Sequence, residues 1–278
     1  MIDSQVKFMH NDHQRLASVP RPAMNTYRLA AALIIERFQW DLSLSSWKHR
    51  KMIKKWSGKY SNKKAIIMCN GPSLKTVDLN LLEQKSIFTF GLNKINLLFD
   101  SSDFRPSCIV SVNPYVIKQN AHFFNKTQLP LFLCHKSEKL IKHRANIHYF
   151  HTINVLGSFA RDCSWSINIG ATVTYMAMQL AFYMGFSKVG LVGCDHYFGT
   201  QGPPNKLVKS GEKDSNHFDE RYFSGGVEWQ LPDLQSSNFH YSIARDTFNH
   251  FGKELVNCTE GGNLEVLKRQ NLISFINS

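Results

Sequence analysis

The sequence lacks both common phosphate-binding patterns of nucleotide enzymes. Neither GxxxxGK[ST] nor GxGxxG occurs, so the usual support for a P-loop kinase or an NAD-binding enzyme is missing. There is no DxD motif and no cluster of metal ligands, so we expect neither a bound metal nor a cofactor. The six cysteines form no CxxC pair, which disfavours a zinc site or a disulfide framework and indicates buried free thiols in a reducing compartment.

Long hydrophobic runs are absent as well. No apolar span of about twenty residues and no signal-peptide pattern is visible, so we expect a cytoplasmic protein. The 278 residues are 43% hydrophobic, which is enough for a substantial core. We therefore predict a helical, basic extension over residues 1–60 and one α/β catalytic domain over residues 61–278.

Acidic residues are outnumbered by basic ones, and the formal net charge is +12. The densest basic block, residues 48–64, reads KHRKMIKKWSGKYSNKK, with Trp56 and Tyr60 interleaved among the lysines. Such a block suits an anionic membrane surface or a nucleic acid backbone, and it suits a solvated helix face equally well. We expect a peripheral contact with the inner membrane face and no nucleic acid partner.

The stretch AIIMCNGPSL, residues 65–74, predicts a strand, a tight turn and a helix in that order. In an open α/β sheet such a turn lies at the carboxyl end of a strand, where ligands bind. Gly71 allows close approach to a ligand, Pro72 suits a helix start, and Ser73 suits phosphate or ribose oxygens. An ordinary turn capped by Asn70 or Ser73 is the alternative.

Asparagine recurs at the predicted ends of the next two strands. Asn93 follows SIFTFGL, and Asn113 follows CIVSV. Because parallel strands end at one edge of a sheet, Asn70, Asn93 and Asn113 are predicted to meet there and bind a base, a ribose and a phosphate. Each one alone could equally be a turn residue.

The second half of the chain contains further candidate residues. A long apolar helix is predicted from about Gly170, with Asn168 and Gly170 as a second nucleotide or anion contact. The strand KVGLV then leads to Asp195 and Tyr197 on the ligand side. The polar segment 199–234 is predicted to be a functional lid. Helices are also predicted over SEKLIKHR, residues 237–251 and NLEVLKR, and strands over LPLFLC, NIHYFH and ELVNCT.

In this order of motifs, residues 62–270 resemble two related groups of proteins. One is the bacterial sialyltransferases of lipooligosaccharide synthesis, which use CMP-sialic acid. The other contains the motility accessory factors, associated with transfer of related nine-carbon sugars, and the archaeal 6-hydroxymethylpterin diphosphokinases. The resemblance implies a doubly wound, mostly parallel Rossmann-like sheet with a lid at about residues 199–234.

The resemblance also implies roles for the residues of the first three strand ends. Asn70, Gly71 and Ser73 match the turn that holds the nucleotide in the sialyltransferases. Asn93 and Asn113 match asparagines that contact the nucleotide and its phosphate.

Further roles fall in the second half of the chain. Gly170 matches the glycine that opens the long helix, but Asn168-Ile169 stands where those enzymes carry Thr-Ser. Tyr197 matches a tyrosine that hydrogen-bonds the leaving phosphate. His217 lies in the lid region that holds their general base.

The function implied is transfer of a nonulosonic acid, or a related sugar, from a CMP-activated donor to a cell-surface glycan or lipid-linked acceptor. Hydroxyls and amides would stabilise the leaving phosphate, and His217 would take the acceptor proton, with His196 or His240 next in line. We expect the enzyme to be a homo-oligomer.

Two other functions remain open on the sequence. A pterin diphosphokinase would need ATP and Mg²⁺, with Asp195 and Asp219 as the candidate carboxylates. A non-catalytic nucleotide- or glycan-binding protein would use the same cleft without turnover.

Overall fold

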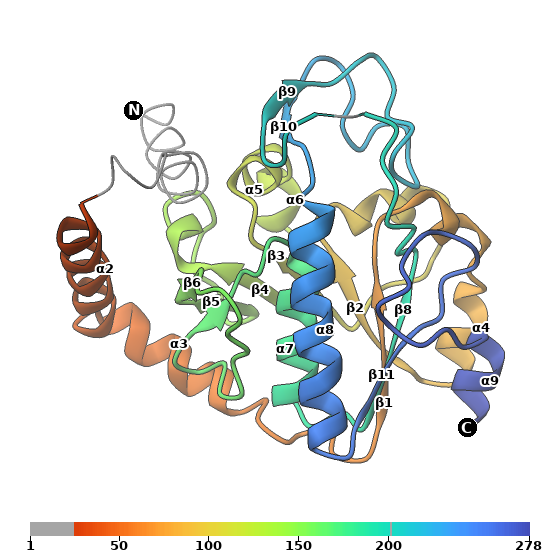
Figure 1. The fold of residues 1–278 in the computed structure, drawn as a ribbon, viewed down its shortest axis with the longest axis horizontal. Helices are drawn as coiled ribbons and strands as arrows, with labels where there is room; N and C mark the ends of the chain where they lie inside the picture. Colours follow the sequence, from red (N-terminus) through yellow and green to blue (C-terminus); the bar gives the residue numbers. More distant parts are fainter. Residues whose placement is uncertain (1–24, 201) are drawn as a thin grey trace.

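The fold is an α/β sandwich with a parallel sheet in the middle (Figure 1). The computed structural model describes residues 25–200 and 202–278. Within these residues, seven strands form one parallel sheet in the order β11-β8-β1-β2-β3-β4-β5. Strand order runs outward from β1 in both directions, so the predicted doubly wound topology is confirmed.

The predicted strands are all present. Those of the main sheet are β1 (Lys64–Met68), β2 (Phe88–Leu92), β3 (Cys108–Ser111), β4 (Leu131–Cys134), β5 (Ile147–Phe150), β8 (Lys188–Val192) and β11 (Glu254–Asn257). Two small sheets are formed by β6 (Thr152–Ile153) with β7 (Ile167–Asn168), and by β9 (Leu207–Lys209) with β10 (Glu228–Gln230).

Helices cover both faces of the sheet. On one face lie α7 (Val173–Tyr183) and α8 (Leu234–His250). The N-terminal pair, α2 (Thr26–Asp41) and α3 (Leu44–Lys54), meets the β5 edge of the sheet. The remaining helices are η2 (Pro72–Thr76), α4 (Leu79–Gln84), η3 (Ile95–Asp100), α5 (Pro114–Gln119), α6 (Ala121–Phe124), η4 (His135–Ser137) and α9 (Leu272–Asn277).

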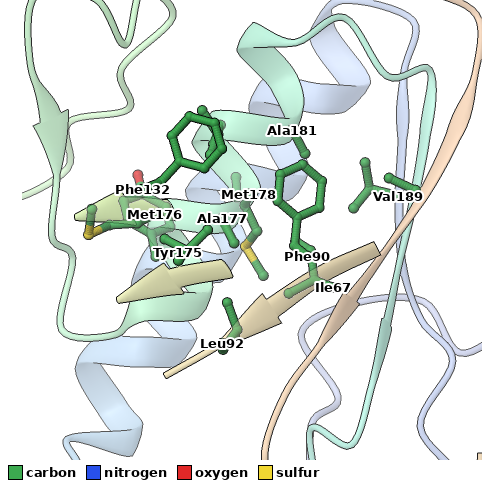
Figure 2. Close-up of a cluster of buried hydrophobic side chains, with 14 of the residues drawn as sticks. Ile67, Phe90, Leu92, Phe132, Tyr175, Met176, Ala177, Met178, Ala181 and Val189 are labelled. Carbon is green, nitrogen blue, oxygen red and sulfur yellow. The ribbon is translucent and has the colours of Figure 1, made fainter. Parts of the chain in front are cut away.

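The nearly all-apolar sequence of α7 is explained by its position. It packs against the central strands on one side and against α8 on another, so most of its side chains are buried. Figure 2 shows Tyr175 and Met178 of α7 packed against Ile67, Phe90 and Phe132 of the strands. The Met and aromatic residues of this helix therefore belong to the core.

Two predicted helices begin or divide differently from the prediction. The helix expected from Gly170 begins at Val173, because Gly170 and Ala171 have φ values of 51° and 68° and Thr172 caps the first turn. The helix expected after the β1 turn divides into η2 and α4, since Val77 is extended and Asp78 caps a new start.

Two other predicted helices are wrong. SEKLIKHR forms turns, because side chains from outside the segment bind two of its carbonyls. The Tyr149 hydroxyl donates to Ile141 O, and Asn125 Nδ2 donates to Leu140 O. NLEVLKR is irregular and contains a bend, and its Lys268 carbonyl accepts from the backbone of Asn257 in β11. The closing helix is α9, which starts after that segment.

The N-terminal extension is helical from Thr26, and residues 1–24 of the predicted extension lie outside the described residues. Aromatic residues of the basic block face the core. Trp56 donates to His148 Nε2 at 2.9 Å, and the ring of Tyr60 stacks on that of Phe186 with 5.0 Å between centroids. The exposed part of the block therefore consists mainly of its lysines.

Two whole-chain expectations can be compared directly. All six cysteines are free and buried, as predicted. Among the described residues, none of the helices combines the length and apolar character needed to cross a bilayer.

Histidines gather where α2 and α3 meet the strands β4 and β5. His49 of α3 and His148 of β5 are buried, and His135 and His151 directly follow the two strands. Burial lowers the pKa of His49, His148 and His151 to about 4, and that of His135 to about 3. The four rings are therefore neutral in the folded protein at pH 7.

We predict that this cluster makes the fold acid-sensitive. An unfolded histidine titrates near pH 6.5, so between pH 6.5 and about 4 the unfolded chain binds more protons and stability falls as pH falls. Urea unfolding at pH 7 and pH 5 should show His148→Gln losing less stability than wild type, by about 2 kcal/mol at most. The control His250→Gln alters an exposed ring and should follow wild type. Equal losses in all three proteins would contradict the assignment.

Candidate active site

A cleft of about 1,000 Å³ opens at the carboxyl ends of the strands. Its walls come from the turns after β1, β2, β3 and β8, from the start of α8 and from the β9–β10 hairpin. Figure 1 shows this hairpin above the strand ends. The predicted site residues that line the cleft are Asn70, Gly71, Asn93, Asn113, Asp195, Tyr197 and His217.

The turn after β1 is pressed against the loop after β8. Gly71 N donates to Gly193 O at 2.8 Å, and Ser73 Oγ donates to Asp195 Oδ2 at 2.8 Å. A Cβ on Gly71 would lie 1.9 Å from Asp195 Oδ2 and 2.7 Å from Gly193 O. Glycine is thus required here for contact between the two loops, and the predicted contact of Gly71 with a ligand stays a prediction.

The three asparagines stand side by side at the sheet edge, but their side chains differ in availability. Asn70 Nδ2 donates to Leu92 O at 3.0 Å, which leaves the buried Asn70 Oδ1 without a partner among the described residues. Asn93 has φ of 50° and accepts from the Ser111 hydroxyl. Asn113 caps α5 through its Oδ1. Asn113 is thus a turn residue that also lines the cleft.

Four predicted ligand contacts do not line the cleft. Pro72 is the first residue of η2, and the Ser73 hydroxyl donates its hydrogen bond to Asp195. Asn168 is fully buried and holds the neighbouring loop through carbonyls at 155 and 158. Gly170 lies between Ile169 and Ala171, which both line the cleft, and a Cβ on Gly170 would overlap the ring of Tyr175. Their contact with a ligand stays a prediction.

The lid is anchored on the turn that it covers. Phe218 N donates to Asn70 O at 2.9 Å, and Asn70 Nδ2 also donates to the hydroxyl of Tyr222 at 3.2 Å. Lys94 Nζ donates to Tyr222 O at 2.5 Å from below. The segment that contains His217 is therefore fixed against the ends of β1 and β2.

His217 faces the cleft from this anchored segment. Its ring stacks on that of Tyr222, with 3.9 Å between centroids and 3° between planes. Its Nδ1 lies 2.7 Å from Asp214 Oδ2. Burial acts to raise the pKa of Asp214, but hydrogen bonds from His217 and from the backbone N–H groups of Asn216 and Phe223 hold that pKa below its ordinary value. Asp214 is therefore ionised at neutral pH.

The other candidate bases, His196 and His240, also line the cleft, and the buried Nε2 of each has no hydrogen-bond partner among the described residues. His240 Nδ1 donates to Ser236 O at 2.7 Å, and its ring is buried between helices. Burial lowers the pKa of His196, whose backbone is left-handed with φ of 54°. Tyr197 is 60% exposed at the cleft and has its hydroxyl available to a ligand.

Sequence reasoning missed Asp214, Tyr222 and Lys94. All three support the position of His217, but none of them belongs to a periodic pattern. The one available signal was composition, because Asp214 and Tyr222 lie in the polar, aromatic segment DSNHFDERYF of the predicted lid.

The carboxylates expected for a diphosphokinase are not side by side. Asp195 lines the cleft, whereas Asp219 lines a separate pocket of about 300 Å³ and pairs with Arg221 at 2.7 Å. The second aspartate in the cleft wall is Asp233, which caps α8.

One group of potential metal ligands lies outside the cleft, among the described residues. It consists of Glu36, His135 and His151, whose ligand atoms are within 4.8 Å of one another. Two cations already occupy this place: Lys136 Nζ lies 3.0 Å from Glu36 Oε1, and Arg37 contacts His151 Nδ1 at 3.3 Å. The group ties α2 to the ends of β4 and β5.

Fold and cleft define a doubly wound α/β protein with a large cleft at its strand ends. The family model described as 6-hydroxymethylpterin diphosphokinase MptE-like matches residues 43–201. This is more than half of the chain, and the chain belongs to that family. No curated protein matches the sequence. A solved MAf glycosyltransferase from Magnetospirillum magneticum is similar at 13% identity and a TM-score of 0.48, covering 83% of this chain and 39% of that one.

The contact between the two turns generates a prediction. Gly71→Ala should lower the free energy of unfolding by roughly 1–3 kcal/mol, because its methyl group overlaps a backbone carbonyl that cannot move freely. Gly211→Ala is the control, since a Cβ there meets only ordinary contacts, and it should stay within about 0.5 kcal/mol of wild type. Urea unfolding measures both variants. Wild-type stability in Gly71→Ala would show that the turn is looser than described.

Proposed function

We propose that the protein is a glycosyltransferase that moves a nonulosonic acid, or a related sugar, from a CMP-activated donor to a glycan or lipid-linked acceptor. The observation that carries this proposal is the cleft itself, where strand-end asparagines form the floor and His217 forms part of the roof. Amides suit a base and a ribose, and a histidine opposite them suits removal of a hydroxyl proton.

The charge of the cleft favours a CMP-sugar over ATP. Pyrophosphoryl transfer is assisted by Lys, Arg and Mg²⁺ clamps on the phosphates. Among the described residues of the cleft wall there is one lysine, Lys206, and no arginine, against the carboxylates Asp195 and Asp233. A donor with a single phosphodiester needs less compensating charge than a triphosphate does.

The proposed reaction uses two side chains in distinct roles. His217 takes the proton from the acceptor hydroxyl as its oxygen attacks the anomeric carbon of the donor sugar. The bond from that carbon to the phosphate oxygen breaks, and CMP leaves. The Tyr197 hydroxyl donates to the leaving phosphate, which spreads its developing charge.

The first test is ligand choice. CMP should raise the melting temperature of the protein more than ATP does, because a ligand that binds only the folded state stabilises it. Incubation with a CMP-activated nonulosonic acid and glycan acceptors should release CMP and yield a longer glycan by mass spectrometry. Pyrophosphorylated pterin from ATP and 6-hydroxymethylpterin would establish the alternative enzyme instead. CMP binding without turnover would indicate a binding protein.

The second test separates the two side chains. His217→Ala should lower turnover by roughly 10²-fold or more with CMP affinity nearly intact, the usual effect of losing a general base. Tyr197→Phe should cost less, about 1.5–3 kcal/mol, because it removes one hydrogen bond to a charged group. Full turnover in His217→Ala would move the role of base to His196 or His240.

The membrane contact is the third part of the proposal. Lys51, Lys54 and Lys55 are exposed on and just after α3, and α2 exposes Tyr27 and Phe38 on the side away from its buried Trp40. Lysines and exposed apolar side chains together suit the surface of an anionic bilayer, where lipid-linked acceptors are held.

Neutralising the three lysines to Gln should weaken binding to phosphatidylserine vesicles at low salt, since each cation near the surface contributes about 1 kcal/mol. The matched control replaces Lys85, Lys126 and Lys268, which are exposed on other elements. Vesicle co-sedimentation compares the two triple variants. An equal loss of vesicle binding in both variants would mean that only the net charge of the protein matters. Unchanged binding in both variants would contradict the membrane contact.

A further inference from the structure

The arrangement of Asp214 and His217 resembles the base and orienting carboxylate of a catalytic pair. The side chain of Asp214 is 2% exposed and that of His217 is 11% exposed. The 2.7 Å distance joins Asp214 Oδ2 to the Nδ1 atom of the ring, and the ring lines the cleft. The direction of this hydrogen bond depends on which of the two side chains carries the proton.

An ionised carboxylate can only accept hydrogen bonds, so Nδ1 of His217 must carry its proton. The neutral ring then has its lone pair on Nε2. No residue in the described part of the chain hydrogen-bonds Nε2, so this atom is available to a ligand in the cleft. The opposite tautomer would place a proton on Nε2 and could not accept one from a hydroxyl.

The carboxylate is itself held in place. Asp214 Oδ2 also accepts from Phe223 N at 3.0 Å, and Asp214 Oδ1 accepts from Asn216 N at 2.8 Å. The backbone N–H of Asp214 donates to Glu220 O at 2.8 Å. Three bonds thus fix Asp214 within the loop, so that it can orient the imidazole without moving.

The ring plane of His217 is fixed independently. Tyr222 stacks on one face, and Phe223 meets the ring edge-on, with 5.2 Å between centroids. With both rotation and tautomer set, little reorganisation is needed when the proton is taken up.

We propose that Asp214 is the positioning residue of this site: it keeps His217 in the tautomer with a free Nε2 and stabilises the imidazolium that forms when Nε2 accepts the acceptor's proton. The proton passes from the hydroxyl to Nε2, and the hydroxyl oxygen uses the freed electron pair to form the new glycosidic bond. This inference rests on the proposed function for its chemistry, but the tautomer can be measured without turnover.

The first measurement is made on the full chain with ¹⁵N-labelled histidine. NMR of the imidazole nitrogens, assigned with His217→Gln, should show His217 with the proton on Nδ1 in the wild-type protein. In Asp214→Asn the carboxamide can also donate to Nδ1, so the Nε2–H tautomer should become populated. A wild-type ring with the proton on Nε2, or unchanged tautomers in the variant, would overturn the proposal whatever the reaction is.

The second measurement is kinetic and uses the CMP-sugar reaction. Asp214→Asn should lower kcat by roughly 10²-fold while the donor KM changes little, because the wrong tautomer cannot act as base. Asp219→Asn is the matched control. Asp219 lies in the same loop and bonds the backbone of Arg221, but it lines the other pocket. It should leave kcat close to wild type.

The outcomes separate the positioning role from a structural one. A rise in KM or a loss of CMP affinity that matches the loss of kcat would mean that Asp214 only shapes the loop, and would refute the proposal. Wild-type kcat in Asp214→Asn would also refute it. If no CMP-sugar is turned over by the wild-type protein, the proposed function fails, while the tautomer measurement still decides the Asp214–His217 relation.

Discussion

The contact between the turns after β1 and β8 is the constraint on which the cleft depends. These two strands are neighbours in the sheet, and their turns meet with no room for a side chain at Gly71. Asp195 bonds Ser73 from one side, and Asn70 reaches the lid from the other. The floor of the site is therefore a single rigid unit made from segments more than 120 residues apart in sequence.

Local sequence patterns were sufficient to predict the sheet. Each of its strands is a short apolar run bounded by polar residues or glycine, and that signal does not depend on the rest of the chain. The meeting of Asn70, Asn93 and Asn113 at one edge follows from parallel topology alone. The lid position of His217 was likewise predicted, although from a family resemblance and not from a pattern.

What could not be predicted depends on contacts between distant residues. The segment SEKLIKHR contains good helix formers, yet the side chains of Asn125 and Tyr149, which lie outside the segment, hydrogen-bond its carbonyls. The hydrogen bond from Ser73 to Asp195 joins residues 122 positions apart. Asp214 and His217 are only three residues apart, but they meet within an irregular loop whose shape no sequence pattern indicates. A single sequence carries no periodic signal for such pairs, so these residues could be proposed only as members of a region.

The lid consists of two parts, a tied segment around His217 and the two-stranded hairpin that carries it. The segment from Asp214 to Phe223 is tied internally and to Asn70, so an insertion there would displace His217. The β9–β10 hairpin frames this segment, because residues 210–227 connect its two strands, and it contributes Leu207 and Trp229 to the cleft wall. The ring of Trp229 stacks on that of Phe223, with 5.2 Å between centroids, so a substitution at Trp229 alters the cleft wall and the packing beside His217 together.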